Sequence, residues 1–421
     1  MNIRLIIALM LAWVVVPATQ AQVQTTSELV GSWTGKINVM GTQLTLVLHL
    51  KQVDGNVVVS LDSPDQSAKG IPCYKDFLSD DSVALKVEMI NAVYHARLVD
   101  GKLNGIFTQR SMSFPLVLSR GVEQLPRPQT PVPPYPYNTQ EVTFSNAPDG
   151  ATLAGTLTLP QGFDTMKKGS APVLLMVTGS GQQNRDEEIF DHKPFLVIAD
   201  HLARHGIATL RYDDRATGES VGGEVKQATT QDFMCDAAAA LQYLRSLNIF
   251  GKVGCMGHSE GATIAFMLAA RQEADFIISL AGPGVKGDTL LAAQANRIMQ
   301  LSGMPASTTV AALRQQQAVQ QVPWMKWFID YDPSDDIRQT HCPVFALNGD
   351  NDSQVISAQN LTAIRRLLPP SSMNLVKEYP SLNHLFQHST TGLPTEYRQI
   401  EETISPEVLN DIAAWVSTVC K

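Results

Sequence analysis

The sequence predicts two domains, a small all-β domain followed by a larger α/β domain whose sheet lies between helices. Three observations support this. Between residues 29 and 120, short runs of alternating apolar and polar residues are separated by turn residues. A stretch dense in proline, 125–136, comes next. From Thr139 onward, apolar runs typical of buried parallel strands alternate with helical stretches, which predicts a sheet covered on both faces.

The all-β domain is expected to span residues 23–122 and to be a barrel or a sandwich. Segments such as 44–50 and 93–98 alternate like half-buried strands, and Asp54-Gly55 and Asp100-Gly101 are hairpin turn signals. Residues 123–138 are expected to be a stiff, extended linker, because proline restricts the backbone. A ligand for a proline-binding domain is the alternative, but the position between two differently patterned regions favours a linker.

Residues 1–22 are interpreted as a signal peptide. Arg4 supplies a positive charge, 5–16 form an apolar run, and the small residues of 17–21 offer a cleavage site. The run is too short for a membrane-spanning helix, which needs roughly 20 residues. An uncleaved anchor is the alternative. We therefore expect a secreted or periplasmic protein without stable membrane insertion.

Charge and cysteine content exclude several classes of partner. The net charge of −8 gives the chain nothing that would attract nucleic acid. The five cysteines are widely spaced, odd in number and lack a C-x-x-C pair, so neither a metal site nor a disulfide framework is predicted. We expect no cofactor. The sequence does not predict the oligomeric state.

The α/β domain is expected to span residues 139–421. A region of helical character at about 283–342 interrupts the alternation and is expected to form a cap that walls an apolar pocket. The predicted strands are 173–177, 207–210, 253–256, 276–280 and 344–347, and the predicted helices are 195–205, 233–247, 262–271 and one that begins after Ser405.

The strongest motif is Gly257-His258-Ser259-Glu260-Gly261, which follows a predicted strand and precedes a predicted helix. A nucleophile elbow of the G-x-S-x-G type requires this strand–turn–helix setting, because the serine hydroxyl must project from a tight, strained turn. Glycines on either side let the neighbouring backbone approach closely. Ser259 is therefore the predicted nucleophile.

On this motif and four others, residues 139–421 resemble the α/β-hydrolase superfamily, in the branch of bacterial esterases and serine-aminopeptidase-like hydrolases. The whole chain is similar to secreted bacterial esterases with an N-terminal β domain. The resemblance implies an α/β-hydrolase sheet with a helical cap insertion, preceded by a small all-β domain. The matching segments are 177–181, 212–215, 257–261, 347–352 and 382–384, in the order that the fold expects.

The resemblance implies a catalytic triad in the chain order serine, acid, histidine. His384 lies in the loop where the family has its base, and a serine hydroxyl needs such a base to become nucleophilic. Asp352, after the predicted strand 344–347, would orient the imidazole. Asp350 is the rival acid in the same turn. His388 is four residues after His384, but no third ligand or H-E-x-x-H glutamate supports a metal site.

An oxyanion hole needs two preorganised N–H donors. One is expected to be the amide of Glu260, directly after the nucleophile. By resemblance the other is the amide of Ser180, with Gly181 as the second choice. Thr178 departs from the usual His-Gly start of this loop, so the position of the second donor is open by one residue.

The leading functional interpretation is a carboxylesterase-type serine hydrolase that cleaves small-molecule esters through an acyl-enzyme intermediate. A peptidase or amidase with the same triad is the alternative, and acidic residues of the cap such as Asp335 and Asp336 could serve a substrate amine. A third hypothesis is a glycan-binding β domain attached to an accessory esterase. No aromatic platform stands out in this domain beyond Trp33, Tyr74 and Tyr94.

Overall fold

The computed structural model describes residues 28–39 and 42–421. These residues form two compact units: the first comprises residues up to 43, 47–61 and 70–122, and the second comprises 44–46, 62–69 and 123–421. The predicted signal peptide, 1–22, lies outside the described residues. Within the described part of the chain, no helix has the length and apolar character needed to cross a membrane.

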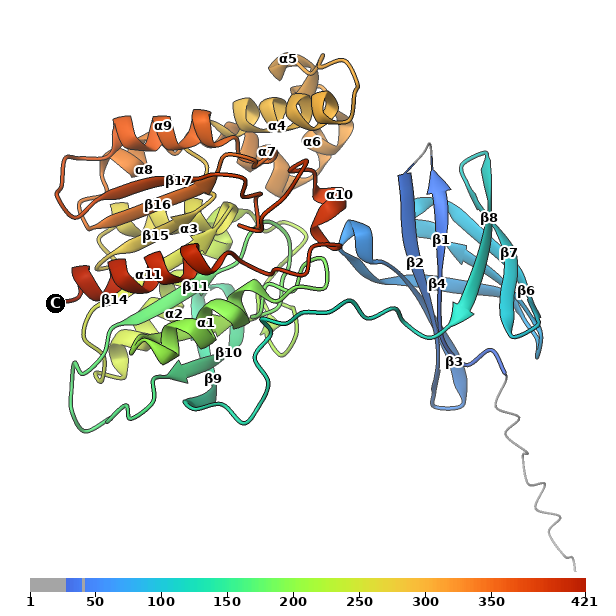
Figure 1. The fold of residues 1–421 in the computed structure, drawn as a ribbon, viewed down its shortest axis with the longest axis horizontal. Helices are drawn as coiled ribbons and strands as arrows, with labels where there is room; N and C mark the ends of the chain where they lie inside the picture. Colours follow the sequence, from blue (N-terminus) through green and yellow to red (C-terminus); the bar gives the residue numbers. More distant parts are fainter. Residues whose placement is uncertain (1–27, 40–41) are drawn as a thin grey trace, which may run out of the picture. The chain divides into compact units, whose positions relative to one another are not determined.

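The N-terminal strands close into an eight-stranded barrel, so of the two predicted alternatives the barrel is the correct one (Figure 1). Asp100 and Gly101 both have positive φ, 50° and 73°, as a type I′ hairpin turn requires. Trp33 and Tyr94 are buried in the barrel, which leaves Tyr74 as the exposed member of the three aromatic candidates. The strands are β1 (Gly31–Val39), β2 (Thr42–Val53), β3 (Asn56–Ser63), β4 (Ala68–Leu78), β5 (Ser82–Val87), β6 (Ala92–Val99), β7 (Lys102–Gln109) and β8 (Met112–Arg120).

The second unit contains a nine-stranded sheet in the order β13-β10-β12-β11-β14-β15-β16-β17, with β9 paired to β10. The strands predicted from apolar runs are present and parallel to one another. These and β17 are β11 (Val173–Val177), β12 (Ala208–Tyr212), β14 (Val253–His258), β15 (Ile277–Leu280), β16 (Val344–Gly349) and β17 (Leu375–Tyr379).

One edge of the sheet contains antiparallel strands that the apolar runs did not predict. There β9 (Asn138–Asn146), β10 (Ala151–Leu159) and β13 (Val221–Gly222) add antiparallel pairings. Most residues of β9 are exposed and polar, so this strand gives no apolar run in the sequence.

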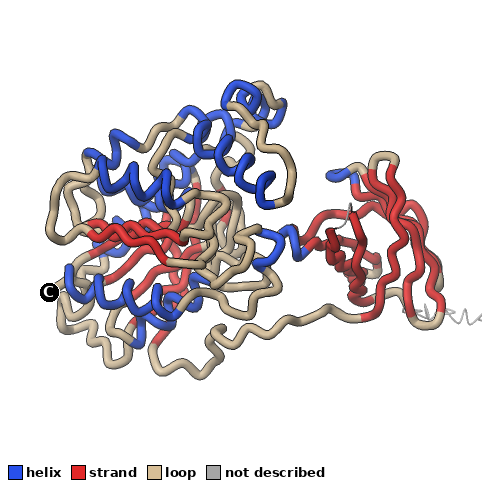
Figure 2. The backbone as a smooth tube through the Cα atoms, turned by 45° about the horizontal axis from the view of Figure 1, so that its top comes forward, coloured by secondary structure: helices blue, strands red, loops and turns tan. Residues whose placement is uncertain are grey.

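Helices cover both faces of the sheet, as predicted (Figure 2). Alternate residues of β11 belong to different cores: Val173, Leu175 and Val177 pack with helices α2, α3, α8 and α9, whereas Leu174 and Met176 pack with α1 and α11. The helices are α1 (Pro194–Arg204), α2 (Thr230–Ser246), α3 (Glu260–Ala270), α8 (Ser334–Arg338), α9 (Ser357–Leu367) and α11 (Pro406–Val419), and a short α10 (Pro394–Tyr397) precedes the last.

The insertion between β15 and β16 is helical, as expected of the cap. Two small apolar clusters hold it together, one of Ala292, Leu313, Val319 and Ile329 and one that joins Leu290 and Phe328 to Val355 of the sheet domain. Besides α8, the cap helices are α4 (Gly287–Leu301), α5 (Val310–Arg314), α6 (Gln317–Gln321) and α7 (Pro323–Asp330). The cap is therefore anchored next to the loop that follows β16.

The proline-rich stretch is fixed to the second unit by hydrogen bonds. The Arg127 guanidinium donates to the carbonyl oxygens of Arg398 at 2.7 Å and of Ile400 at 3.2 Å, and the Gln129 side chain donates to the Ile404 carbonyl at 2.7 Å. The start of the predicted linker is therefore bonded to residues 398–404.

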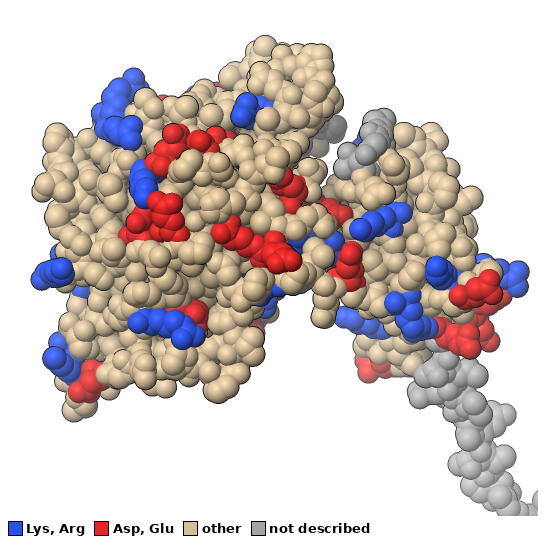
Figure 3. All heavy atoms as spheres, viewed as in Figure 1, with Lys and Arg blue, Asp and Glu red and all other residues tan. Residues whose placement is uncertain are grey.

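Charged side chains of both signs are interspersed on the face shown in Figure 3, where no continuous basic patch is visible. Several are paired, such as Lys377 with Glu407 and Asp411. Paired surface charges of this kind contribute little to stability and leave little net field to attract a polyanion.

Candidate active site

Ser259 lies on a sharp turn between β14 and α3. Its backbone has φ 53° and ψ −114°, a combination that is unfavourable for a residue with a side chain. The Ser259 amide donates to the Leu280 carbonyl on the neighbouring strand β15 at 2.8 Å, which helps to hold the turn. Strain of this kind is typical of a nucleophile elbow, where the hydroxyl projects from the end of the strand.

Both glycines of the G-x-S-x-G motif are required by the available space. A Cβ atom on Gly257 would lie 1.9 Å from the carbonyl oxygen of Gly261, and one on Gly261 would lie 2.2 Å from the carbonyl oxygen of Val177. Both distances are far inside van der Waals contact. A larger residue at either position would therefore push α3 away from the sheet.

The structure brings His384 and Asp352 together in the loops after β16 and β17. His384 Nδ1 lies 2.7 Å from Asp352 Oδ2, and both side chains are buried. The other carboxylate oxygen of Asp352 accepts from the amides of Gln354 and Val355 at 2.7 and 2.9 Å. The Asp350 carboxylate instead accepts from the Ser381 amide at 2.6 Å. The geometry therefore favours Asp352 as the partner of the imidazole and leaves its Nε2 for a nucleophile.

Ser259 and His384 line one cavity of about 390 Å³. Its walls are mainly apolar, and α7 of the cap contributes Trp324, Met325 and Phe328. Among the described residues that line the cavity, none is Asp, Glu, Lys or Arg. The cavity therefore suits an uncharged, apolar group next to the serine.

The loop after β11 supplies the candidate oxyanion donors. The Gly179 amide is already used, because it donates to Glu187 Oε1 at 2.8 Å. The next residue, Ser180, lines the cavity with Ser259, so its amide is the better candidate. Glu260 is the first residue of α3, and the first amides of a helix have no carbonyl partner inside that helix. These two amides are the donors predicted from the sequence.

Glu187 and His258 form a buried pair that the sequence analysis did not identify. His258 Nδ1 lies 2.9 Å from Glu187 Oε1, and His258 Nε2 lies 3.0 Å from the carbonyl oxygen of His384. Burial lowers the pKa of His258, but the Glu187 carboxylate and the two hydrogen bonds outweigh burial and raise it above its ordinary value. A ring that donates to both acceptors joins the elbow, the loop of Gly179 and the loop of His384.

Known hydrolases resemble this chain in sequence and in fold. Residues 193–333 match the family described as serine aminopeptidase, S33. Over 329 residues the chain is 23% identical to esterase EstD of Thermotoga maritima. The alignment covers 75% of this chain and 74% of EstD. The chain has the α/β-hydrolase fold. The hydrolase is also similar to the solved structures of Pyrococcus furiosus esterase Pf2001, at 15% identity, and of Est1E from Butyrivibrio proteoclasticus, at 14% identity.

Each of these similarities covers more than half of this chain. Pf2001 covers 71% of this chain and 99% of its own, with a TM-score of 0.45. Est1E covers 66% of this chain and 98% of its own, with a TM-score of 0.42. Within residues 28–39 and 42–421 of the hydrolase, no three His, Cys, Asp or Glu side chains gather as a metal ion would require.

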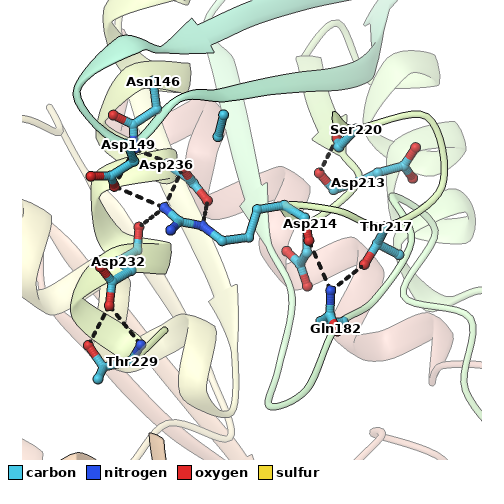
Figure 4. A network of polar contacts seen from close by, with 12 residues as sticks. Asn146, Asp149, Gln182, Asp213, Asp214, Thr217, Ser220, Thr229, Asp232 and Asp236 are labelled. Atoms are coloured by element: carbon cyan, nitrogen blue, oxygen red, sulfur yellow. Dashed lines mark hydrogen bonds and ion pairs between the residues drawn. The ribbon is translucent and has the colours of Figure 1, made fainter. Parts of the chain in front are cut away.

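An ion cluster behind the site ties the antiparallel edge of the sheet to α2. The Arg215 guanidinium bonds Asp236 through Nε at 2.7 Å and Asp149 at 3.0 Å (Figure 4). Asp149 lies in the turn between β9 and β10, and Asp236 lies on α2. Arg215 thus holds parts of the hydrolase together and does not contact the cavity residues described above.

Asp214 stabilises the loop after β11, which contains the candidate oxyanion donor Ser180. Its carboxyl group accepts from the Gln183 amide at 2.8 Å and from the Thr178 hydroxyl at 3.1 Å. Burial raises the pKa of Asp214 to about 8, against these hydrogen bonds, which lower it. The group is therefore largely protonated in the folded hydrolase at neutral pH.

We predict that Asp214→Asn flattens the pH dependence of stability. An acid whose pKa rises from 3.8 to about 8 on folding contributes stability that is fully present below pH 3.8 and is lost as the pH rises to about 8. The loss is at most about 1.4 kcal/mol per pH unit. Asparagine mimics the neutral carboxyl group, so the stability of the variant should not fall in this way as the pH rises. Urea unfolding between pH 4.5 and 8.5 measures the two slopes.

Asp213→Asn is the matched control, because the neighbouring carboxylate behaves in the opposite way. Burial raises the pKa of Asp213, but hydrogen bonds from Arg185 and from the amides of Glu219 and Arg185 outweigh burial and lower it. Its contribution is present above the unfolded pKa and is lost as the pH falls, so Asp213→Asn should lower stability most at neutral pH. Parallel curves for wild type and Asp214→Asn would contradict the prediction.

Proposed function

We propose that the hydrolase cleaves carboxylic esters through an acyl-enzyme intermediate. His384 Nε2 takes the proton of the Ser259 hydroxyl while Oγ attacks the ester carbonyl carbon. The tetrahedral intermediate then breaks its bond to the alcohol oxygen, which leaves with the proton from His384. Water attacks the acyl-serine with His384 again as base, and this step releases the acid and restores Ser259. The observation that supports the proposal best is the 2.7 Å contact of Asp352 with His384, whose ring shares a cavity with Ser259.

The amides of Ser180 and Glu260 are proposed to bind the oxyanion. Two N–H donors fixed by the backbone need no reorganisation when the negative charge forms, which is why such donors stabilise the transition state. The positive end of α3 adds to this, since Glu260 is the first residue of that helix.

The proposed substrate is an ester with an uncharged acyl group. The described residues around the cavity are apolar or neutral, and leucine, methionine and aromatic side chains form much of the wall. Transfer of apolar acyl carbons from water to such a wall stabilises binding by about 0.8 kcal/mol per buried CH₂. The similarity to EstD, which is named as an esterase, also supports this class.

Aminopeptidase activity is the second candidate, because the matching family is described as a serine aminopeptidase. A substrate ammonium group needs a carboxylate partner when it leaves water. Asp335 pairs with Arg338, the Asp336 carboxylate accepts from the Tyr331 hydroxyl, and neither residue lines the cavity. Glu187 and Glu260 are already engaged by His258 and Trp324. The site therefore favours esters over peptides with a free amine.

Three chromogenic substrates distinguish the two candidates: p-nitrophenyl butyrate, alanine p-nitroanilide and N-acetyl-alanine p-nitroanilide. We expect turnover of the ester and no preference for the free amine over the acetylated one. An aminopeptidase would prefer the free amine by about 30-fold or more, because a buried charge pair is worth 2 kcal/mol or more. A preference of that size, or inactivity on every short ester, would contradict the proposal.

We also propose that residues 1–22 direct export and that the mature chain begins near Gln22 or Val23. The positive Arg4, the apolar run and the small residues before the cleavage point support this. The mature hydrolase would then act outside the cytoplasm, on esters that reach the secreted or periplasmic space.

A further inference from the structure

The side chain of Glu260 contacts two other parts of the fold at once. Its Oε1 accepts from the Thr230 hydroxyl of α2 at 2.6 Å and from the indole N–H of Trp324 in cap helix α7 at 2.7 Å. The residue is 4% exposed, and it directly follows the nucleophile. A single buried oxygen therefore joins the elbow, α2 and the cap.

Trp324 is part of the cavity wall. Its ring stacks on Phe328, with centroids 5.2 Å apart, and both residues line the cavity that contains Ser259. Other polar contacts of α7 remain within the cap, since Arg314 of α5 bonds the Asp330 carboxylate and the Ile329 carbonyl. The indole N–H is thus a direct polar link from this wall to the residue next to the nucleophile.

The chemical surroundings of Glu260 indicate that its side chain has a positioning role. The groups that bond it are neutral donors, and a buried carboxylate without a cation is costly. Burial raises the pKa of Glu260, against hydrogen bonds from Thr230, Trp324 and Ser180, which lower it. A negative charge here would oppose the oxyanion at the adjacent amide. Its presence is best explained by the need for an acceptor that two buried donors share.

We infer that Glu260 is a positioning residue that fixes the cap wall relative to Ser259 through Trp324, and that this link determines which acyl chains the site selects. The inference rests on the proposed ester hydrolysis. An acetyl group is too short to depend on the wall, whereas a longer acyl chain must pack against Trp324 and Phe328. Loss of the link should therefore penalise long acyl groups and spare acetate.

Trp324→Phe tests the inference, because it removes the N–H donor and keeps an aromatic ring. We expect kcat/KM for p-nitrophenyl octanoate to fall about tenfold relative to the acetate, mostly through KM, since one apolar contact in a pocket is worth 10-fold or more. Trp327→Phe is the matched control. Trp327 is on the same helix and stacks on Tyr331, but it is not among the cavity-lining residues. The octanoate-to-acetate ratio of this variant should therefore equal that of wild type.

Glu260→Gln and Glu260→Ala complete the experiment. Glutamine keeps the acceptor oxygen, so this variant should retain the wild-type octanoate-to-acetate ratio whatever its overall rate, whereas Glu260→Ala should show the ratio of Trp324→Phe. A wild-type ratio in an active Trp324→Phe variant would overturn the inference and leave the proposed function intact. Inactivity of the wild type on both esters would overturn the proposed function and the inference with it.

Discussion

Replacement of Ser259 by alanine is expected to lower kcat/KM for short p-nitrophenyl esters by about 10⁵-fold or more, because loss of a triad nucleophile removes covalent catalysis as a whole. The fold should persist, since Ser259 contributes its backbone to the elbow and alanine keeps the Cβ atom. The Ser259 amide can still donate to the Leu280 carbonyl. Steady-state kinetics and the melting temperature of the variant measure both expectations.

Ser279→Ala is a matched control for this substitution. Ser279 lies on β15 and is fully buried, and its hydroxyl has no hydrogen-bond partner among the residues that the structure describes. Its removal should leave activity unchanged and keep or raise stability, because an unsatisfied buried polar group is lost. A fluorophosphonate probe should label wild type and Ser279→Ala but not Ser259→Ala. Labelling of the Ser259→Ala variant would mean that another residue is the nucleophile.

The elbow could be predicted from the sequence because its determinants are local. Five consecutive residues, an apolar strand before them and a helical stretch after them contain the whole signal. The same holds for the central strands, whose residues are buried on both faces and therefore form apolar runs. β9 gave no such signal, because its exposed side chains are free to be polar.

The contacts that organise the site could not be predicted, because they join distant segments. Glu187 and His258 are 71 residues apart, and Glu260 and Trp324 are 64 residues apart. No local spacing indicates that such side chains meet. The sequence did indicate that the cap insertion would wall a pocket, but it did not indicate that the Trp324 indole N–H would bond the carboxylate beside the nucleophile.

The choice between Asp352 and Asp350 illustrates the same limit, since the fold puts the acid in this turn without fixing its register. The hydrogen bonds separate the two residues: one carboxylate contacts His384 Nδ1, and the other accepts from the Ser381 amide. We therefore expect Asp352→Asn to be far more damaging than Asp350→Asn, although both substitutions are isosteric and lie in the same turn.

Asp352→Asn should lower kcat by about 10⁴-fold, because it reverses the polarity of one hydrogen bond. The amide oxygen of asparagine can still accept from the amides of Gln354 and Val355, as Oδ1 does now. The NH₂ group must then face His384 Nδ1 and donate to it. That arrangement puts the ring proton on Nε2, so the imidazole cannot take the proton of Ser259.

Asp350→Asn should change kcat by less than about fivefold, since an exposed hydrogen bond of this kind rarely contributes more than ~1 kcal/mol. Kinetics on p-nitrophenyl butyrate, with melting temperatures to show that both variants are folded, measure the difference. A larger loss in Asp350→Asn would assign the acid to that residue, and equal losses would mean that the turn as a whole, and not one carboxylate, supports His384. The expected ranking follows from the tautomer of a single ring, which only Asp352 is positioned to set.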